Sequence, residues 1–167
     1  MRAIVWIAEC TWEACVHQTM ALLPEDAEIT LLHVASQDVE EFAARGSARL
    51  LGRHPPPPPG PPLRAIAEEE AQALLAEARA RLARPARIES RRGRVEREVV
   101  AACAGADLLI LARDGEPRLG PKSLGKHTRF VVDHVPCQVL LLWAVPPPGI
   151  ETIPPPPPPP AAPPQPH

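Results

Sequence analysis

A chain of 167 residues can form one complete hydrophobic core but is too short for two ordinary domains. Its formal net charge is only -2 and aromatic residues make up 3% of it, so it offers neither a basic surface nor stacking platforms for nucleic acid. No apolar run reaches the roughly 18 to 20 residues that a membrane helix needs. The chain starts with a strand-like run and shows no signal peptide, so we expect a cytoplasmic protein with no nucleic-acid or membrane partner.

Most of the 25 prolines gather in two places, "PPPPPGPP" at 55–62 and "VPPPGIETIPPPPPPPAAPPQPH" at the end of the chain. Polyproline lacks backbone donors and favours an extended left-handed helix, so neither run can join a sheet. We therefore predict one folded domain over residues 1–145, interrupted by a proline-rich loop insertion at about 53–62. A disordered proline-rich tail over 146–167 should follow it. The sequence leaves open whether residues 36–62 form a lid.

Apolar runs of strand length occur along the rest of the chain. Four of them are nearly continuous, as in strands that are covered on both faces of a parallel sheet: "AIVWIA" at 3–8, "EITLLHVA" at 28–35, "DLLILA" at 107–112 and "QVLLLW" at 138–143. A weaker run, "ARIESRR" at 86–92, alternates between polar and apolar residues and suits a strand nearer the edge.

Helical patterns separate these runs. They are "TWEACVHQTMALL" at 11–23 with Thr11 as its cap, "LRAIAEEEAQALLAEARARLAR" at 63–84 stopped by Pro85, "GRVEREVVAACAGA" at 93–106 ended by Gly105, and "KHTRFVVDHV" at 126–135. Five strands alternating with four helices predict an α/β fold, a doubly wound and mostly parallel five-stranded sheet with helices on both faces. Ligands of such sheets bind beyond the carboxyl ends of the strands, which singles out the segments at 8–11 and 112–126.

The second of these segments contains Gly-x-x-x-x-Gly-Lys, the skeleton of a P-loop, from Gly120 to Lys126. His127 stands where Ser or Thr should hold magnesium, and Gly120 lies eight residues beyond Ala112 rather than directly after the strand. Only one strand follows, which leaves little room for an acidic strand to hold the metal. These departures argue against a true P-loop ATPase.

We predict neither a metal site nor a catalytic group. Cys10, Cys15 and His17 are the nearest approach to a ligand set, but Cys15 and His17 are two residues apart on a predicted helix and point in different directions. Buried or reduced thiols are the simpler interpretation. Arg113 and Asp114 are typical of a solvated loop pair, and no nucleophile is placed by the sequence beside a base and an orienting group.

A wider spacing fits the second segment better. Gly115 and Gly125 are separated by nine residues, and Ala112 stands three before Gly115. This resembles the phosphate loop of the universal stress protein family, which reads Gly-x-x-Gly, nine residues, then Gly followed by Ser or Thr. The runs "IVWIAECTWEA", "LLHVAS" and "RFVVDHVPCQVLLLW" are similar to the family's first strand and turn, second strand, and closing helix and strand. The resemblance covers residues 1–145 apart from the insertion and implies an adenine nucleotide alpha hydrolase-like fold.

The resemblance also implies a pocket for ATP or another adenine nucleotide, with Mg²⁺ accompanying it. The implied residues are Ala8, Glu9 and Val34 at the adenosine, Ala112, Arg113 and Gly115 along the phosphates, and Gly125, Lys126, His127 and Thr128 at the start of the last helix. Free amides and the positive end of a helix dipole attract phosphate there. Three positions depart from the family pattern: Ala112 replaces the first glycine, Lys126 the hydroxyl residue, and Glu9 the usual aspartate.

Three functions follow as hypotheses. The first is a stress-response protein that acts by binding an adenine nucleotide rather than by catalysis, as a homodimer paired along the last strand, Gln138 to Trp143. The second is a nucleotide-independent interaction module that dimerises and offers its polyproline tail to a polyproline-binding partner. The third is a weak ATPase, in which replacing Lys126 would reduce turnover.

Overall fold

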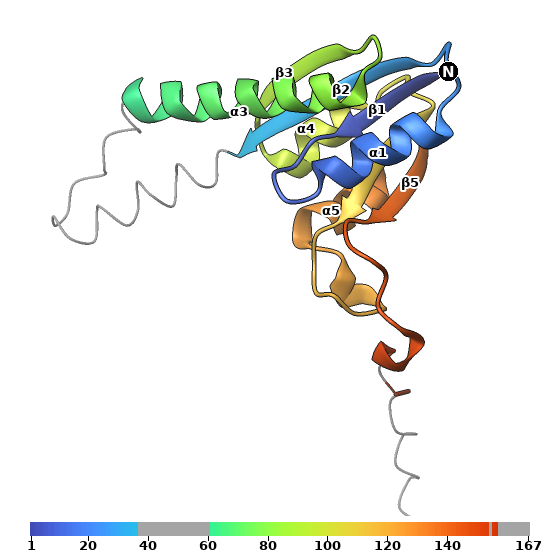
Figure 1. Ribbon diagram of the computed structural model, residues 1–167. Coiled ribbons are helices and arrows are strands. Elements are labelled where there is room, and N and C mark those ends of the chain that lie inside the picture. Colours follow the sequence, from blue (N-terminus) through green and yellow to red (C-terminus); the bar gives the residue numbers. More distant parts are fainter. Residues whose placement is uncertain (37–60, 154, 157–167) are drawn as a thin grey trace, which may run out of the picture.

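The computed structural model describes residues 1–36, 61–153 and 155–156. Five strands form one all-parallel sheet in the order β3-β2-β1-β4-β5, with helices packed on both of its faces (Figure 1). The strands are β1 (Arg2–Trp6), β2 (Glu28–Ser36), β3 (Arg87–Gly93), β4 (Leu108–Arg113) and β5 (Gln138–Trp143). The helices are α1 (Trp12–Leu22), α3 (Pro61–Leu82), α4 (Val95–Ala102) and α5 (Lys126–His134), with short 3-10 turns η1 (Pro121–Ser123) and η2 (Ile150–Thr152). The predicted doubly wound α/β fold is confirmed.

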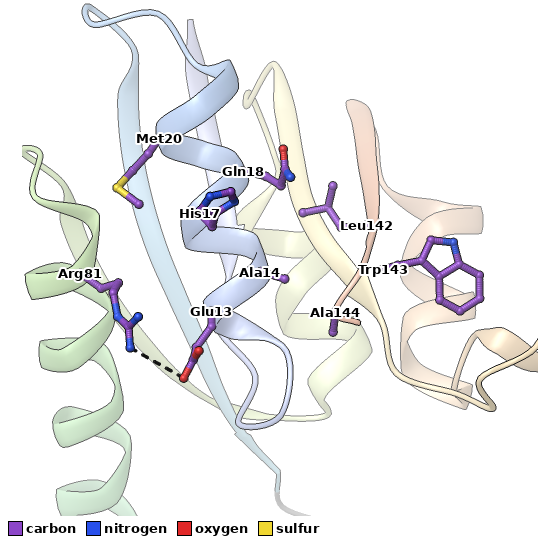
Figure 2. Close-up of a pocket in the computed structure, with 9 residues that line it drawn as sticks. All are labelled: Glu13, Ala14, His17, Gln18, Met20, Arg81, Leu142, Trp143 and Ala144. Carbon is purple, nitrogen blue, oxygen red and sulfur yellow. Dashed lines mark ion pairs between the residues drawn. The ribbon is translucent and has the colours of Figure 1, made fainter. Parts of the chain in front are cut away.

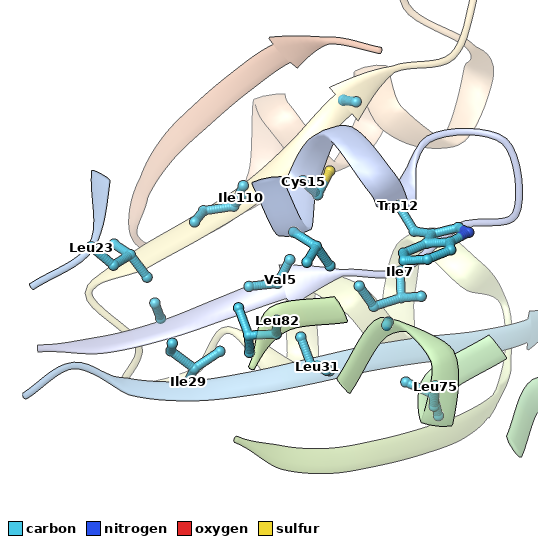
Figure 3. Close-up of a cluster of buried hydrophobic side chains, with 14 of the residues drawn as sticks. Val5, Ile7, Trp12, Cys15, Leu23, Ile29, Leu31, Leu75, Leu82 and Ile110 are labelled. Carbon is cyan, nitrogen blue, oxygen red and sulfur yellow. The ribbon is translucent and has the colours of Figure 1, made fainter. Parts of the chain in front are cut away.

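One core lies between the sheet and the helices α1 and α3. Val5, Leu31 and Ile110, from three neighbouring strands, are fully buried there against α1 and α3 residues such as Val16 and Leu75 (Figure 3). Successive residues of a strand point to opposite faces, so the intervening apolar residues are buried on the other side. This explains why the sequence shows continuous apolar runs rather than alternation.

The second core lies between the sheet and the helices α4 and α5. Leu32, Leu109 and Leu111 contribute to it from the strands, and Val99 and Val131 from the two helices. The weakly alternating run at 86–92 forms β3, which lies at one edge of the sheet and is half exposed, as predicted. The strand β5 lies at the other edge, and so its residues are only partly buried.

Several element ends differ from the sequence prediction. The strand β1 ends at Trp6, two residues early, because the carbonyl of Ala8 already accepts hydrogen bonds from the amides of Thr11 and Trp12, both at 3.0 Å. Thr11 occupies the N-cap position of α1, yet its side chain makes no capping hydrogen bond. The Trp12 amide donates its hydrogen bond to the Ala8 carbonyl instead.

The prolines also behave differently from the prediction at two places. The helix α3 begins at Pro61, inside the predicted insertion, because proline is compatible with the first turn of a helix. In the predicted tail, Ile150–Thr152 form the 3-10 turn η2. The rest of the insertion, including the segment considered as a lid, and most of the tail lie outside the described residues. None of the described helices is long and apolar enough to cross a bilayer.

Candidate functional site

The segment between β4 and α5, residues 114–125, forms a compact loop that we call the β4–α5 loop. Its two ends are joined by backbone hydrogen bonds: the Gly115 amide donates to the Ser123 carbonyl at 3.0 Å, and the Glu116 amide to the Lys122 carbonyl at 2.8 Å. A Cβ atom on Gly115 would lie 2.3 Å from the Lys122 carbonyl oxygen, which no real contact allows. The loop therefore closes only because position 115 is glycine.

The amide of Gly125, at the N-cap of α5, is engaged by the chain itself. It donates to the Asp114 carboxylate, with 2.7 Å between the nitrogen and Oδ1. An N-terminal helix amide and the positive end of the helix dipole both favour a negative partner. A carboxylate of this chain thus occupies the place where the family resemblance puts a phosphate.

Arg113, the last residue of β4, is turned away from this carboxylate. Its Nη1 donates to the hydroxyl of Ser123, a fully buried residue of η1, and its guanidinium lies 4.8 Å from the ring centroid of Trp143. Arg113 and Trp143 are register partners on β4 and β5, which accounts for the stacking. Asp114 is exposed to solvent as predicted, but it forms no pair with Arg113, because each of the two side chains has a different partner.

The first turn of α5 carries backbone amides that have no acceptor within the helix. Within the described part of the chain, the amides of Lys126, His127 and Thr128 have no hydrogen-bond partner. The side chain of Lys126 is exposed and takes part in no ion pair among the described residues, whereas Thr128 is buried. This end of α5 can therefore donate to an anion through its backbone, with the exposed side chain of Lys126 beside it.

His127 faces a different neighbour. Its Nδ1 lies 2.7 Å from Oε2 of Glu96, a buried residue in the first turn of α4, and Arg94 lies 3.5 Å from the other carboxylate oxygen. Burial alone would raise the pKa of Glu96, but hydrogen bonds from its own amide and from His127, with the charges of His127 and Arg94, outweigh burial and lower the pKa. The pair joins the starts of α4 and α5.

The remaining predicted residues lie around the carboxyl ends of the inner strands. Ala8 and the exposed Glu9 form the turn after β1, and no hydrogen bond or ion pair links Glu9 to the β4–α5 loop among the described residues. Val34 is buried in the core on the α4 and α5 face. Ala112 is buried in the opposite core, between the sheet and the helices α1 and α3.

Comparisons with known proteins agree with the observed fold. A model of the universal stress protein family matches residues 9–142. The chain belongs to the universal stress protein family. No curated protein sequence matches the chain.

Solved universal stress proteins share the fold at low identity. One, in complex with cAMP, is 14% identical, with 87% of this chain and 98% of that chain covered and a TM-score of 0.58. UspA from Lactobacillus plantarum is 18% identical, with 85% of this chain and 97% of that chain covered and a TM-score of 0.50. A family protein from Arabidopsis thaliana with AMP bound is 14% identical, with 86% and 91% covered and a TM-score of 0.53. At these identities the likeness establishes the fold alone.

The structure brings together part of the predicted site of this universal stress protein. Gly115 and Gly125 belong to the hydrogen-bonded loop, Lys126 begins the helix that follows it, and Arg113, the last residue of β4, is bonded to the loop through Ser123. Sequence reasoning missed the role of Asp114, whose position directly before the loop's first glycine was the available signal. It also missed Glu96 and Trp143, which are brought to the site by other elements of the fold.

The β4–α5 loop also contacts the segment that follows β5. The amide of Leu119 donates to Oγ1 of Thr152 at 3.0 Å, and this hydroxyl donates in turn to the Gly149 carbonyl at 2.7 Å. The turn η2 therefore lies against the tip of the loop, as Figure 1 shows. The start of the proline-rich tail is thus anchored at the candidate site.

A groove of ≈ 530 Å³ lies away from this loop, between α1 and the end of β5 (Figure 2). Leu142 and Ala144 line one side of it, while His17 and the ion pair of Glu13 with Arg81, at 3.9 Å, line the other. No residue of the β4–α5 loop lines this groove. We therefore place the candidate ligand site at the loop, where the free amides are, and associate the groove with the exposed edge of the sheet.

Replacing Glu96 by glutamine should reduce stability in a pH-dependent way. The lowered pKa of Glu96 means that its ionised form stabilises the fold above the ordinary value of 4.5, and that this contribution is lost as the pH falls through the lowered folded-state value. The variant should therefore unfold more easily than the wild type at pH 7, and the difference in the free energy of unfolding should shrink as the pH falls below 4.5. Chemical denaturation at pH 7 and at a series of lower pH values measures the difference.

The matched control is the same change at Glu98, two residues further along α4. Its partner Arg91 lies 3.6 Å away and its side chain is more exposed, so a change of at most about 1 kcal/mol is expected. The two variants could lose equal amounts of stability, or the loss of stability for the Glu96 variant could fail to shrink as the pH falls. Either result would contradict a specific role for the buried pair of Glu96 and His127.

Proposed function

We propose that this universal stress protein binds an adenine nucleotide, ATP or AMP, at the β4–α5 loop and acts in a stress response through binding rather than catalysis. The observation that carries the proposal is the first turn of α5, where Lys126, His127 and Thr128 direct amides without partners among the described residues toward the loop. Such a turn is suited to a phosphate, because amide donors and the helix dipole act together.

The residues around this turn fit a phosphorylated ligand. Lys126 is an exposed cation next to the amides, and at Gly125 only the end of an exposed side chain, the Asp114 carboxylate, stands between a ligand and the backbone. The solved relatives with cAMP and with AMP support the choice of an adenine nucleotide. The described residues contain no group of three His, Cys, Asp or Glu side chains suited to a metal, so Mg²⁺ enters the proposal only as a companion of the phosphates.

Calorimetric titration of ATP and of AMP into the purified full-length chain tests this function, together with mass spectrometry of any nucleotide released on denaturation. We expect binding in the micromolar range or a co-purified adenine nucleotide. Absence of both would contradict nucleotide binding and would favour the interaction module, whose polyproline-binding partner would then be sought. Steady hydrolysis of ATP that falls when Lys126 is replaced would instead favour the weak ATPase.

We also propose that two copies of the chain pair along β5. This strand lies at the edge of the sheet, all of its residues after Gln138 are only partly buried, and Leu142 and Ala144 line the groove next to it. An unpaired edge with apolar side chains is a template for a further strand. A sedimentation experiment that finds only monomer at micromolar concentration would argue against this dimer.

A further inference from the structure

We propose that Asp114 is a built-in competitor for the phosphate at the start of α5 and thereby sets the ligand preference of the site. A ligand that brings a phosphate to this turn has to displace the carboxylate or bind beside its charge, whereas a ligand without a phosphate does neither. The inference rests on the proposed function, because it concerns the same nucleotide site. It adds a specificity-determining residue that lies in the loop but matches none of the family's glycine or hydroxyl positions.

The carboxylate of Asp114 lies directly against the N-terminus of α5. Oδ1 accepts from the Gly125 amide at 2.7 Å, and the two carboxylate oxygens lie 2.7 and 2.8 Å from the point where a Cβ of residue 125 would be. The group therefore fills the space that the absence of a side chain at Gly125 leaves open. A phosphate oxygen that accepts from the same amide would have to occupy this space.

No basic side chain of the described residues forms an ion pair with this carboxylate. Its neighbour Arg113 is held by Ser123 and Trp143, whereas the nearby Glu116 is paired with Arg118 at 3.6 Å and with Lys122 at 3.9 Å. The charge of Asp114 is thus balanced mainly by the end of the helix. An incoming phosphate would meet a like charge that is not neutralised by an ion pair with any described residue.

This arrangement has a definite consequence for affinity. Binding of a phosphate must break the bond between Asp114 and Gly125 and rotate the side chain away, or tolerate repulsion at short range. The side chain is exposed, so the repulsion is moderated by water and weakens as salt is added. Adenosine carries no phosphate and should be insensitive to the charge at position 114.

Calorimetric titration of ATP and of adenosine into the wild type and Asp114→Asn tests the inference. Asparagine keeps an oxygen for the Gly125 amide but removes the charge. We expect ATP to bind about fivefold to tenfold more tightly to the variant at low salt, with a smaller gain at high salt, and adenosine to bind within about twofold of the wild type. The matched control Glu25→Gln removes an exposed acidic side chain from the turn before β2, at the opposite end of the parallel strands, and should leave both affinities unchanged.

Asp114→Ala serves as a second variant in case the asparagine retains the competing bond, and thermal unfolding checks that both variants are folded. Unchanged or weaker ATP binding by both folded variants, with adenosine and ATP still bound by the wild type, would overturn the inference and leave the proposed function standing. An equal gain in affinity for adenosine and for ATP would also overturn the inference. If no variant and no wild-type protein binds either ligand, the proposed function fails and the inference fails with it.

Discussion

Gly125→Glu should lower the affinity for an adenine nucleotide by more than about 100-fold, while the sheet stays folded. The backbone at Gly125, with φ of -64° and ψ of 171°, is extended and open to any residue, so the substitution adds no backbone strain. The nearest atoms to a new Cβ belong to the Asp114 carboxylate, which can move because it is the end of an exposed side chain. The added carboxylate would then stand at the start of α5, where the proposed phosphate binds.

Calorimetric titration of ATP measures this loss, and far-ultraviolet circular dichroism with thermal unfolding confirms the fold. Gly125→Ala is the matched control, because its methyl group displaces Asp114 without adding a charge. We expect the alanine variant to retain binding that the glutamate variant lacks. Unchanged affinity in a folded glutamate variant would place the nucleotide site elsewhere on the molecule.

The fold of this universal stress protein could be predicted from local patterns because its sheet is buried on both faces. The residues of β1, β2 and β4 are apolar almost without interruption, and such runs have few alternatives to the interior of a parallel sheet. Element ends were harder to predict. The strand β1 stops early because the carbonyl of Ala8 takes part in the turn to α1, and nothing in the local sequence shows which carbonyl a turn will use.

The candidate site was predicted less completely than the fold. The nine-residue spacing between Gly115 and Gly125 indicated the loop, and glycine at 115 is explained by the close approach of the Lys122 carbonyl. The partners of Arg113 and Asp114 were not predictable from the chain order. Arg113 reaches Trp143 only because β5 lies beside β4, and Asp114 reaches Gly125 only because the loop closes over ten intervening residues.

Gly115→Ala should lower both the stability of the protein and its affinity for nucleotide. The new Cβ would lie 2.3 Å from the Lys122 carbonyl oxygen and 2.6 Å from the Ser123 carbonyl carbon, and both are backbone atoms that cannot rotate aside. The ends of the β4–α5 loop would have to separate, which weakens the hydrogen bonds donated by the amides of Gly115 and Glu116. We expect a loss of about 1–3 kcal/mol in the free energy of unfolding, and ATP binding weakened at least about tenfold.

Urea denaturation and calorimetric titration measure the two effects, and Gly149→Ala is the matched control. A Cβ at Gly149 would also lie too close to a neighbour, 2.1 Å from Oε2 of Glu151, but that atom is the free end of a side chain and can rotate away. The backbone at Gly149 is extended as well, so this control should be nearly neutral. Equal stability of the two variants would show that the loop can open at no cost. Its closed form would then not be what positions the start of α5 for a ligand.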